Sequence, residues 1–152
     1  MHLAIGSDHA GYRLKETITS SLLDAGHAVD DVGTGSEASV DYPDFAADVA
    51  RRVVSGACDR GILVCGTGVG MAMAANKIDG VRAAAAGDLE SARLARAHND
   101  ANILTLGARI TRPDLALAIV RLFLETPFEG GRHQRRVDKI MALESSRADV
   151  PR

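Results

Sequence analysis

Five short apolar runs alternate with helix-like segments along most of this chain, and no other feature of the sequence restricts its fold as strongly. Runs typical of buried strands occupy residues 2–5, 28–32, 62–64, 81–85 and 103–106. Consecutive parallel strands need a long crossover connection, which a helix usually supplies. We therefore predict an α/β fold, a doubly wound and Rossmann-like parallel sheet of about five strands with helices on both faces.

The segments between these runs carry apolar residues at helical spacing. Leu14, Ile18 and Leu22 form one such stripe, and Pro113 suits the first turn of a later helix. A length of 152 residues suits one domain with a real core. We assign a single domain to residues 1–152, with a C-terminal helical arm that begins at about residue 130.

Composition excludes several classes of partner. The formal charge of −2 and the aromatic content of 3% provide neither a basic field nor stacking platforms for nucleic acid. No apolar run approaches the roughly 20 residues of a membrane span, and the N-terminus has no basic segment before an apolar core. Cys58 and Cys65 have no metal-ligand spacing, and so few cysteines fit a reducing compartment. We expect a cytoplasmic protein that binds neither nucleic acid nor membrane.

A glycine-rich loop follows the third apolar run. Residues 66–70, with the sequence GTGVG, join that run to a helix-like segment at 71–77. Glycines at alternate positions let successive N–H groups turn toward one point, and a helix start adds its positive dipole end. The spacing fits neither a Walker loop, which needs Lys after the glycines, nor a dinucleotide fingerprint, which needs the third glycine one residue later. We interpret the loop as a cradle for an anion.

Cys65 is the last residue before this loop. A thiol beside a helix N-terminus and a cluster of amides has its thiolate form favoured, so Cys65 is a candidate base near neutral pH. The alternative is that Cys65 is a small, buried core residue. The loop alone does not decide between these two roles.

Several polar residues follow the predicted strands. Because parallel sheets bind ligands outside the carboxyl ends of their strands, we expect Asp8, His9, Asp88 and the segment 107–109 to join the Cys65 loop at one edge. We expect His98 at the same edge. His98 either ends a helix as a C-cap residue or donates a proton to the ring oxygen of a cyclic sugar. Asp8 and His9 have a similar alternative, a turn that caps the next helix.

These residue types suit proton transfer next to the carbonyl group of a phosphorylated substrate. Cys65 would move the proton, and the loop amides would stabilise the enediolate oxygen. Arg132 lies three residues before Arg135 and four before Arg136, so either pair shares a helix face and could clamp a phosphate. The alternative is a solvated basic turn.

Six motifs together resemble one known family. They are DHAG at 8–11, DYP at 41–43, CGTGVG at 65–70, AANK at 74–77, HND at 98–100 and GGRHQRRV at 130–137. Their order and spacing are similar to those of the family of ribose-5-phosphate isomerase B and galactose-6-phosphate isomerase. The resemblance implies a sugar-phosphate isomerase without metal or cofactor, which interconverts ribose 5-phosphate and ribulose 5-phosphate through an enediolate. It also implies a homodimer, or a tetramer, whose sites draw residues from both chains.

The resemblance implies roles for individual residues as well. Cys65 is similar to the family's proton-shuttling base, His98 to the residue that opens the furanose ring, and Thr67 to a residue that holds the developing oxyanion. The implied substrate-binding residues are Asp8, His9, Gly66, Gly68, Val69, Gly70, Asn99, Arg109, Arg132, His133 and Arg136. The arm from Arg132 to Arg136 would serve the site of the partner chain.

Two questions stay open at this point. One branch of the family takes its base as a Glu at the position where this chain has Met71. Because Met71 has no basic group, this chain resembles the branch whose base is a cysteine. The choice of sugar is not decided, because relatives with the same motifs act on hexose or tetrose phosphates or on free sugars. A sugar-phosphate binding module without catalysis is the alternative from another class, although binding alone requires neither Cys65 nor His98.

Overall fold

The computed structural model of the chain describes residues 1–145, which form one five-stranded sheet and six helices. The strands are β1 (His2–Ser7), β2 (Ala28–Asp31), β3 (Arg60–Cys65), β4 (Ala83–Ala85) and β5 (Ile103–Gly107). The helices are α1 (Tyr12–Asp24), α2 (Tyr42–Val54), α3 (Val69–Ala75), α4 (Leu89–Ala97), α5 (Pro113–Glu125) and α6 (Arg132–Ser145). Every predicted strand and helix is present, with ends shifted by a few residues.

The strands are all parallel and lie in the order β2-β1-β3-β5-β4. This arrangement confirms the predicted doubly wound α/β fold. β3 is central: Ile62 pairs with Ile5 of β1 on one side and with Leu104 of β5 on the other. Residues 61–65 of β3 are all buried, because helices cover both faces of the sheet, and this burial accounts for their apolar character.

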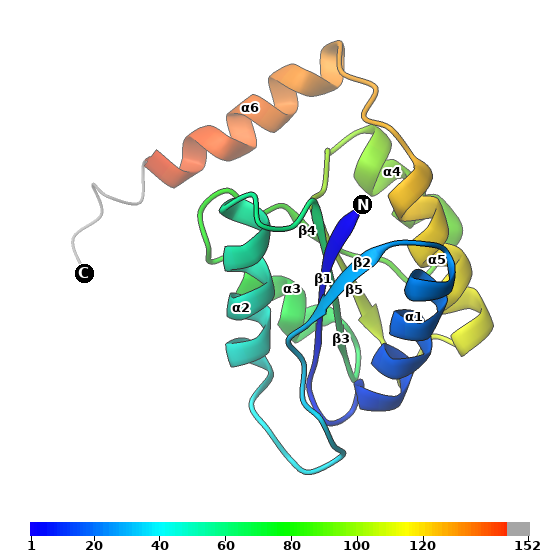
Figure 1. Ribbon diagram of the computed structural model, residues 1–152. Coiled ribbons are helices and arrows are strands. Elements are labelled where there is room, and N and C mark those ends of the chain that lie inside the picture. The colour runs from blue at the N-terminus through cyan, green and yellow to red at the C-terminus, as the bar shows by residue number, and fades with distance from the viewer. Residues whose placement is uncertain (146–152) are drawn as a thin grey trace.

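Two hydrophobic cores lie on opposite faces of the sheet (Figure 1). On one face, Ile62 and Val64 pack with apolar residues of α1, α4 and α5. On the other face, Leu63 and Cys65 pack with residues of α2 and α3. Successive side chains of a strand point to opposite faces, so the single strand β3 contributes to both cores.

The common direction of the strands gives the sheet a carboxyl edge and an amino edge. In Figure 1 the N label marks the amino edge at the top, and the loop between β2 and α2 marks the carboxyl edge at the bottom. Each helix that connects two parallel strands starts at the carboxyl edge and returns to the amino edge. This direction decides which polar residues can meet within one chain.

Helix α6 runs away from the sheet (Figure 1). It follows Gly130 and Gly131, whose φ angles of 64° and 53° lie in the left-handed region. His133 and Val137 are its buried residues. Hydrogen bonds from the Gly80 amide to Glu144 (2.8 Å) and from Arg82 to the Met141 sulfur (3.3 Å) tie the helix to the turn before β4. None of the helices within residues 1–145 combines the length and apolar character needed to cross a membrane.

Candidate active site

The carboxyl ends of β1 and β3 form the point where the winding of the sheet reverses. The chain leaves β1 toward β2 on one side and leaves β3 toward β4 on the other. Ligands of doubly wound sheets bind at such switch points. The turn after β1 joins the loop after β3 here, since the Asp8 amide donates a hydrogen bond to the Val64 carbonyl (3.3 Å).

The loop after β3 folds back on Cys65. The Gly68 amide donates a hydrogen bond to Cys65 Sγ over 3.2 Å, and the thiol is 5% exposed. An N–H group that points at sulfur stabilises negative charge developing there. The Gly68 amide therefore serves the sulfur. The Val69 amide faces Thr67 Oγ1 within the same loop (3.4 Å).

Strand β5 holds this loop in shape. Gly68 has a φ of +80°, and a Cβ at this position would lie 2.9 Å from the backbone carbonyl carbon of Leu106 in β5. The hydroxyl of Thr105, also in β5, donates a hydrogen bond to the Gly68 carbonyl (2.8 Å). Only glycine fits this approach, because both the backbone angle and the space exclude a side chain.

Arg109 and Tyr42 cover the two ends of the loop. A Cβ on Gly66 would lie 3.1 Å from Arg109 Nη1, and one on Gly70 would lie 2.8 Å from Tyr42 Cζ. Glycine at both positions thus admits a guanidinium group and a phenol ring to the loop backbone. Tyr42 was missed as a site residue from the sequence, where the DYP motif was the one available clue.

Asp8 and His9 form the turn after β1. Asp8 Oδ1 accepts a hydrogen bond from the amide of Gly11, the N-cap residue of α1 (3.0 Å), so one oxygen of the Asp8 carboxylate shapes this turn. The Val40 amide donates to His9 Nδ1 (3.2 Å). Because Nδ1 accepts this bond, the proton of the neutral imidazole belongs on Nε2. His9 Nε2 is then available as a donor at the carboxyl edge.

His98 does not lie at this edge, and the expectation that it would is wrong. Asp88 caps the start of α4 at the carboxyl edge by accepting a hydrogen bond from the Ser91 amide (2.8 Å). The helix then returns to the amino edge, where His98 is its C-cap residue. Asn99 follows there, and α6 carries Arg132, His133 and Arg136 from the same side.

A second cluster of site residues therefore forms at the amino edge. The rings of His98 and His133 stack with their centroids 4.0 Å apart. Glu129 Oε2 lies 3.7 Å from His98 Nε2 and 3.6 Å from His133 Nε2. Burial lowers the pKa of His133, and the neighbouring His98 and Arg132 lower it further. Glu129 is a member of this cluster that the sequence analysis did not identify.

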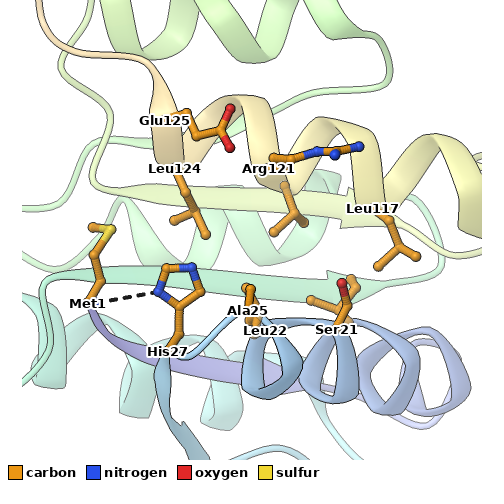
Figure 2. Close-up of a pocket in the computed structure, with 11 residues that line it drawn as sticks. Met1, Ser21, Leu22, Ala25, His27, Leu117, Arg121, Leu124 and Glu125 are labelled. Atoms are coloured by element: carbon orange, nitrogen blue, oxygen red, sulfur yellow. Dashed lines mark hydrogen bonds between the residues drawn. The ribbon is translucent and has the colours of Figure 1, made fainter.

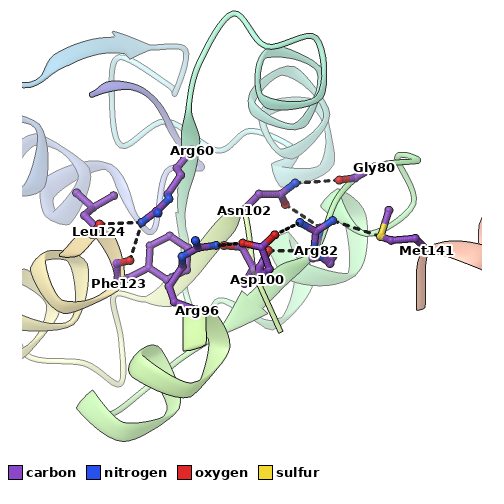
Figure 3. A network of polar contacts seen from close by, with 10 residues as sticks. Arg60, Gly80, Arg82, Arg96, Asp100, Asn102, Phe123, Leu124 and Met141 are labelled. Carbon is purple, nitrogen blue, oxygen red and sulfur yellow. Dashed lines mark hydrogen bonds and ion pairs between the residues drawn. The ribbon is translucent and has the colours of Figure 1, made fainter. Parts of the chain in front are cut away.

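A polar network fixes the turn that carries His98 and Asn99 (Figure 3). Asp100, the next residue, has an unusual φ of +46°. Its carboxylate accepts hydrogen bonds from Arg96 (2.8 Å) and Arg82 (3.1 Å), and its carbonyl accepts another from Arg82 (2.9 Å). Arg82 also contacts Met141 of α6, so one side chain connects the turn to the arm.

A cavity of about 590 Å³ between α1 and α5 is separate from both clusters (Figure 2). Apolar side chains such as Leu22, Leu117 and Leu124 line much of it. The Met1 amine contacts His27 Nδ1 at its rim (3.4 Å). No residue of the carboxyl-edge or amino-edge cluster lines this cavity, so we place the candidate site at the edges of the sheet.

Comparison with known proteins identifies the family of the chain. The sequence pattern of a family described as Ribose/Galactose Isomerase matches residues 3–140. Ribose-5-phosphate isomerase B of Escherichia coli (strain K12) is 47% identical, over 95% of this chain and 97% of that protein.

Solved structures give the same result. Ribose-5-phosphate isomerase B of Clostridium thermocellum has a TM-score of 0.95 and 53% identity, covering 96% of this chain and 99% of that one. The Mycoplasma genitalium enzyme, solved with bound ribulose-5-phosphate, has a TM-score of 0.91 and 46% identity, covering 95% of this chain and 96% of that one. Sequence pattern, relatives and fold thus agree that the chain belongs to the ribose/galactose isomerase family.

Proposed function

We propose that this protein is an aldose–ketose isomerase that interconverts D-ribose 5-phosphate and D-ribulose 5-phosphate. The observation that carries the proposal is the position of Cys65, whose sulfur lies at the switch point of the sheet and accepts the Gly68 amide (3.2 Å). The chain is also 47% identical to an enzyme named for this reaction.

Cys65 is the proposed base. Its thiolate takes the proton from C2 of the open-chain aldose, and the C–H electrons form the double bond of an enediolate. The protonated thiol exchanges its hydrogen with solvent and then gives a proton to C1, while one proton moves from the C2 hydroxyl to the oxygen on C1, so the ketose has the same composition as the aldose. Thr67 and the amides of Gly66, Val69 and Gly70 are the proposed donors to the enediolate oxygen.

Substrate binding uses both clusters. Asp8, His9 and Asn99 are the proposed contacts of the sugar hydroxyls. Exposed guanidinium groups suit the phosphate, since Arg binds phosphate oxygens through paired N–H groups. The residues proposed for the phosphate end are Arg109, Arg132, His133 and Arg136. His98 is the proposed acid that opens the furanose ring.

The two clusters lie at opposite edges of one sheet, which supports a shared site. Cys65 ends β3 at the carboxyl edge, whereas His98 lies at the amino edge. A single sugar phosphate cannot contact both within one chain. We propose a homodimer, or an assembly of such dimers, in which the amino-edge cluster and α6 of one chain complete the carboxyl-edge site of the other. Residues 1–152 then act as one isomerase domain.

A free thiol also bears on where the enzyme works. Cys58 and Cys65 are both free cysteines. A catalytic thiol must stay reduced to act as a base, and the cytoplasm keeps thiols reduced. We therefore propose a cytoplasmic enzyme.

Proton NMR in heavy water tests the proposed reaction. Purified protein is incubated with ribose 5-phosphate, beside allose, galactose and tetrulose phosphates and one free aldose. We expect fastest ketose formation from the pentose, with deuterium entering at the carbon next to the carbonyl, and no reaction in Cys65→Ala. Faster turnover of another sugar would change the assigned substrate but leave the proposed proton-transfer mechanism unchanged. Binding without turnover of any sugar would favour a binding module, and a fully active Cys65→Ala would end the thiolate mechanism.

A further inference from the structure

Three side chains of the kinds that bind metals meet at the amino edge, on the α2 face of the sheet. His2 comes from β1, Asp30 from β2 and Cys58 from the connection before β3. His2 Nε2 lies 2.8 Å from Asp30 Oδ1, and Cys58 Sγ lies 3.6 Å from Asp30 Oδ2. The nitrogen, oxygen and sulfur ligand atoms all lie within 4.8 Å of one another.

Strand register and backbone hydrogen bonds bring these groups together. Asp30 pairs with Ala4, and because side chains alternate along a strand, Asp30 shares a face with Ala4 and His2. Cys58 is 2% exposed and packs in the hydrophobic core on that face. Its neighbour Asp59 exchanges two hydrogen bonds with the His2 backbone, both of 2.7 Å. The three ligand-bearing segments are thus held in place by the fold itself.

The surrounding charges prepare the carboxylate as a ligand. The Asp30 carboxylate contacts His2 Nε2 through Oδ1 (2.8 Å). Arg52 donates to Asp30 Oδ2 (3.0 Å) and is itself held by Asp48 (3.2 Å). Such outer hydrogen bonds orient the ligands of metal sites. Burial and then Asp30 raise the pKa of the Cys58 thiol to about 11, so in the metal-free protein this thiol is protonated.

We propose that His2, Asp30 and Cys58 form a binding site for a divalent transition metal ion of the zinc class. One nitrogen, one carboxylate and one sulfur suit zinc or cobalt rather than magnesium or calcium, which prefer oxygen alone. Bond lengths of about 2.0 Å to nitrogen and oxygen and 2.3 Å to sulfur require ligand atoms about 3 to 4 Å apart. The observed spacings are 2.8 Å from His2 Nε2 to Asp30 Oδ1 and 3.6 Å from Cys58 Sγ to Asp30 Oδ2, and binding requires the three side chains, now within 4.8 Å of one another, to close in on one ion.

Binding exchanges protons for the ion. The thiol proton of Cys58 leaves to solvent as the sulfur binds. His2 binds through Nε2 with its proton on Nδ1, and a water molecule takes the fourth position of a tetrahedral ion. Arg52 keeps its hydrogen bond to the carboxylate.

The ion would join β1, β2 and the α2–β3 connection at the edge opposite Cys65. It would therefore stabilise the fold and take no part in isomerisation. The inference is independent of the proposed function, because none of its three ligands belongs to the proposed active site.

Cobalt spectroscopy tests the site. In the Cys65→Ala background Cys58 is the one remaining cysteine, since the chain has two. We expect anaerobic cobalt(II) titration to give one bound ion per chain, with a thiolate-to-cobalt charge-transfer band and the intense visible bands of a tetrahedral ion. Zinc should displace the cobalt and raise the melting temperature. Cys58→Ser should remove the charge-transfer band, and His2→Gln should weaken binding at least tenfold.

A control variant and a check of folding make the result decisive. His133→Gln, which alters the other histidine cluster, should leave the charge-transfer band unchanged, because cobalt bound there has no sulfur ligand. Circular dichroism confirms that each variant is folded. A missing charge-transfer band at millimolar cobalt in the folded parent would overturn the site. So would a band that survives Cys58→Ser, or an affinity that His2→Gln leaves unchanged.

Discussion

The imidazole rings of His98 and His133 stack with their centroids 4.0 Å apart and their planes 10° from parallel, although one ends α4 and the other begins α6. When two imidazole rings lie this close, a positive charge on one ring disfavours a positive charge on the other. His133 is the buried member, and its pKa is lowered by burial first and by His98 next. A proton on His133 therefore favours the unfolded chain, which predicts sensitivity to acid.

The first prediction concerns that sensitivity. Below about pH 6.5 an unfolded chain protonates this histidine, whereas the folded chain resists protonation because its pKa is lower. The contribution of neutral His133 to the free energy of unfolding is therefore fully present above that pH and is lost as the pH falls. Urea midpoints measured between about pH 7.5 and 5.5 should fall less steeply for His133→Gln than for the parent. If the urea midpoints of His133→Gln and the parent fall equally steeply with pH, the lowered pKa of His133 does not contribute to the acid sensitivity.

The second prediction tests the shared site. Cys65→Ala and His98→Asn chains should each be inactive as homodimers. If each site takes Cys65 from one chain and His98 from the other, a mixed dimer contains one intact site. Random exchange of equal amounts should then restore about a quarter of the parent activity, since half the dimers are mixed and half their sites are intact. The absence of recovery in verified mixed dimers would place both residues in one chain's site.

The third prediction concerns Gly68. A methyl group there meets the Leu106 backbone at 2.9 Å and forces a side chain into a left-handed conformation. Gly68→Ala should cost about 1 to 3 kcal/mol of unfolding free energy and most of the activity. Gly35→Ala is the matched control, because a Cβ there has no atom within 4 Å. Equal stability of the two variants in urea would contradict the argument.

The fourth prediction concerns the support of the loop from β5. Thr105 is fully buried and donates to the Gly68 carbonyl over 2.8 Å. Thr105→Val leaves that carbonyl without its donor, so stability should fall by about 1 to 3 kcal/mol. Turnover should fall as well, since Gly68, whose carbonyl loses its donor, also carries the amide that contacts Cys65. Thr105→Ser keeps the hydroxyl and should recover most of the activity in steady-state assays.

The fifth prediction assigns a positioning role to Arg82. Arg82→Met removes two hydrogen bonds to Asp100 and the contact to Met141, which should loosen the turn that carries His98. Turnover of ring-forming sugars should fall more than turnover of a short substrate that cannot cyclise. Combined with His98→Asn, the loss should be less than additive. Arg93→Met is the control: it breaks an exposed ion pair with Glu90 and should change turnover of neither kind of substrate.

Much of the fold could be predicted because local pattern determined it. The run at Ile62 to Val64 is buried on both faces, and Gly26, placed to end the first helix, has the expected positive φ of 82°. The edge at which His98 lies was predicted wrongly. The direction of the chain was enough to correct it, because a helix that connects parallel strands must end at the amino edge.

Other features of the site depend on packing between distant segments. Tyr42 meets Gly70 because α2 and α3 share a face of the sheet, and no spacing in the sequence measures that distance. Glu129 lies near both histidines only once α4 and α6 are in place. Sequence motifs identified the residue types of the candidate site, while their division between two edges emerged from the topology.

Helix α6 extends away from its own sheet, and this geometry has a consequence for how such a protein evolves. If the arm completes a neighbour's site, a substitution in Arg132 or Arg136 impairs the neighbour and leaves the chain that carries it able to work with an unaltered partner. A gene encoding the damaged arm would then produce mixed assemblies with partial activity. Selection would act on pairs of residues that never approach one another within a single molecule.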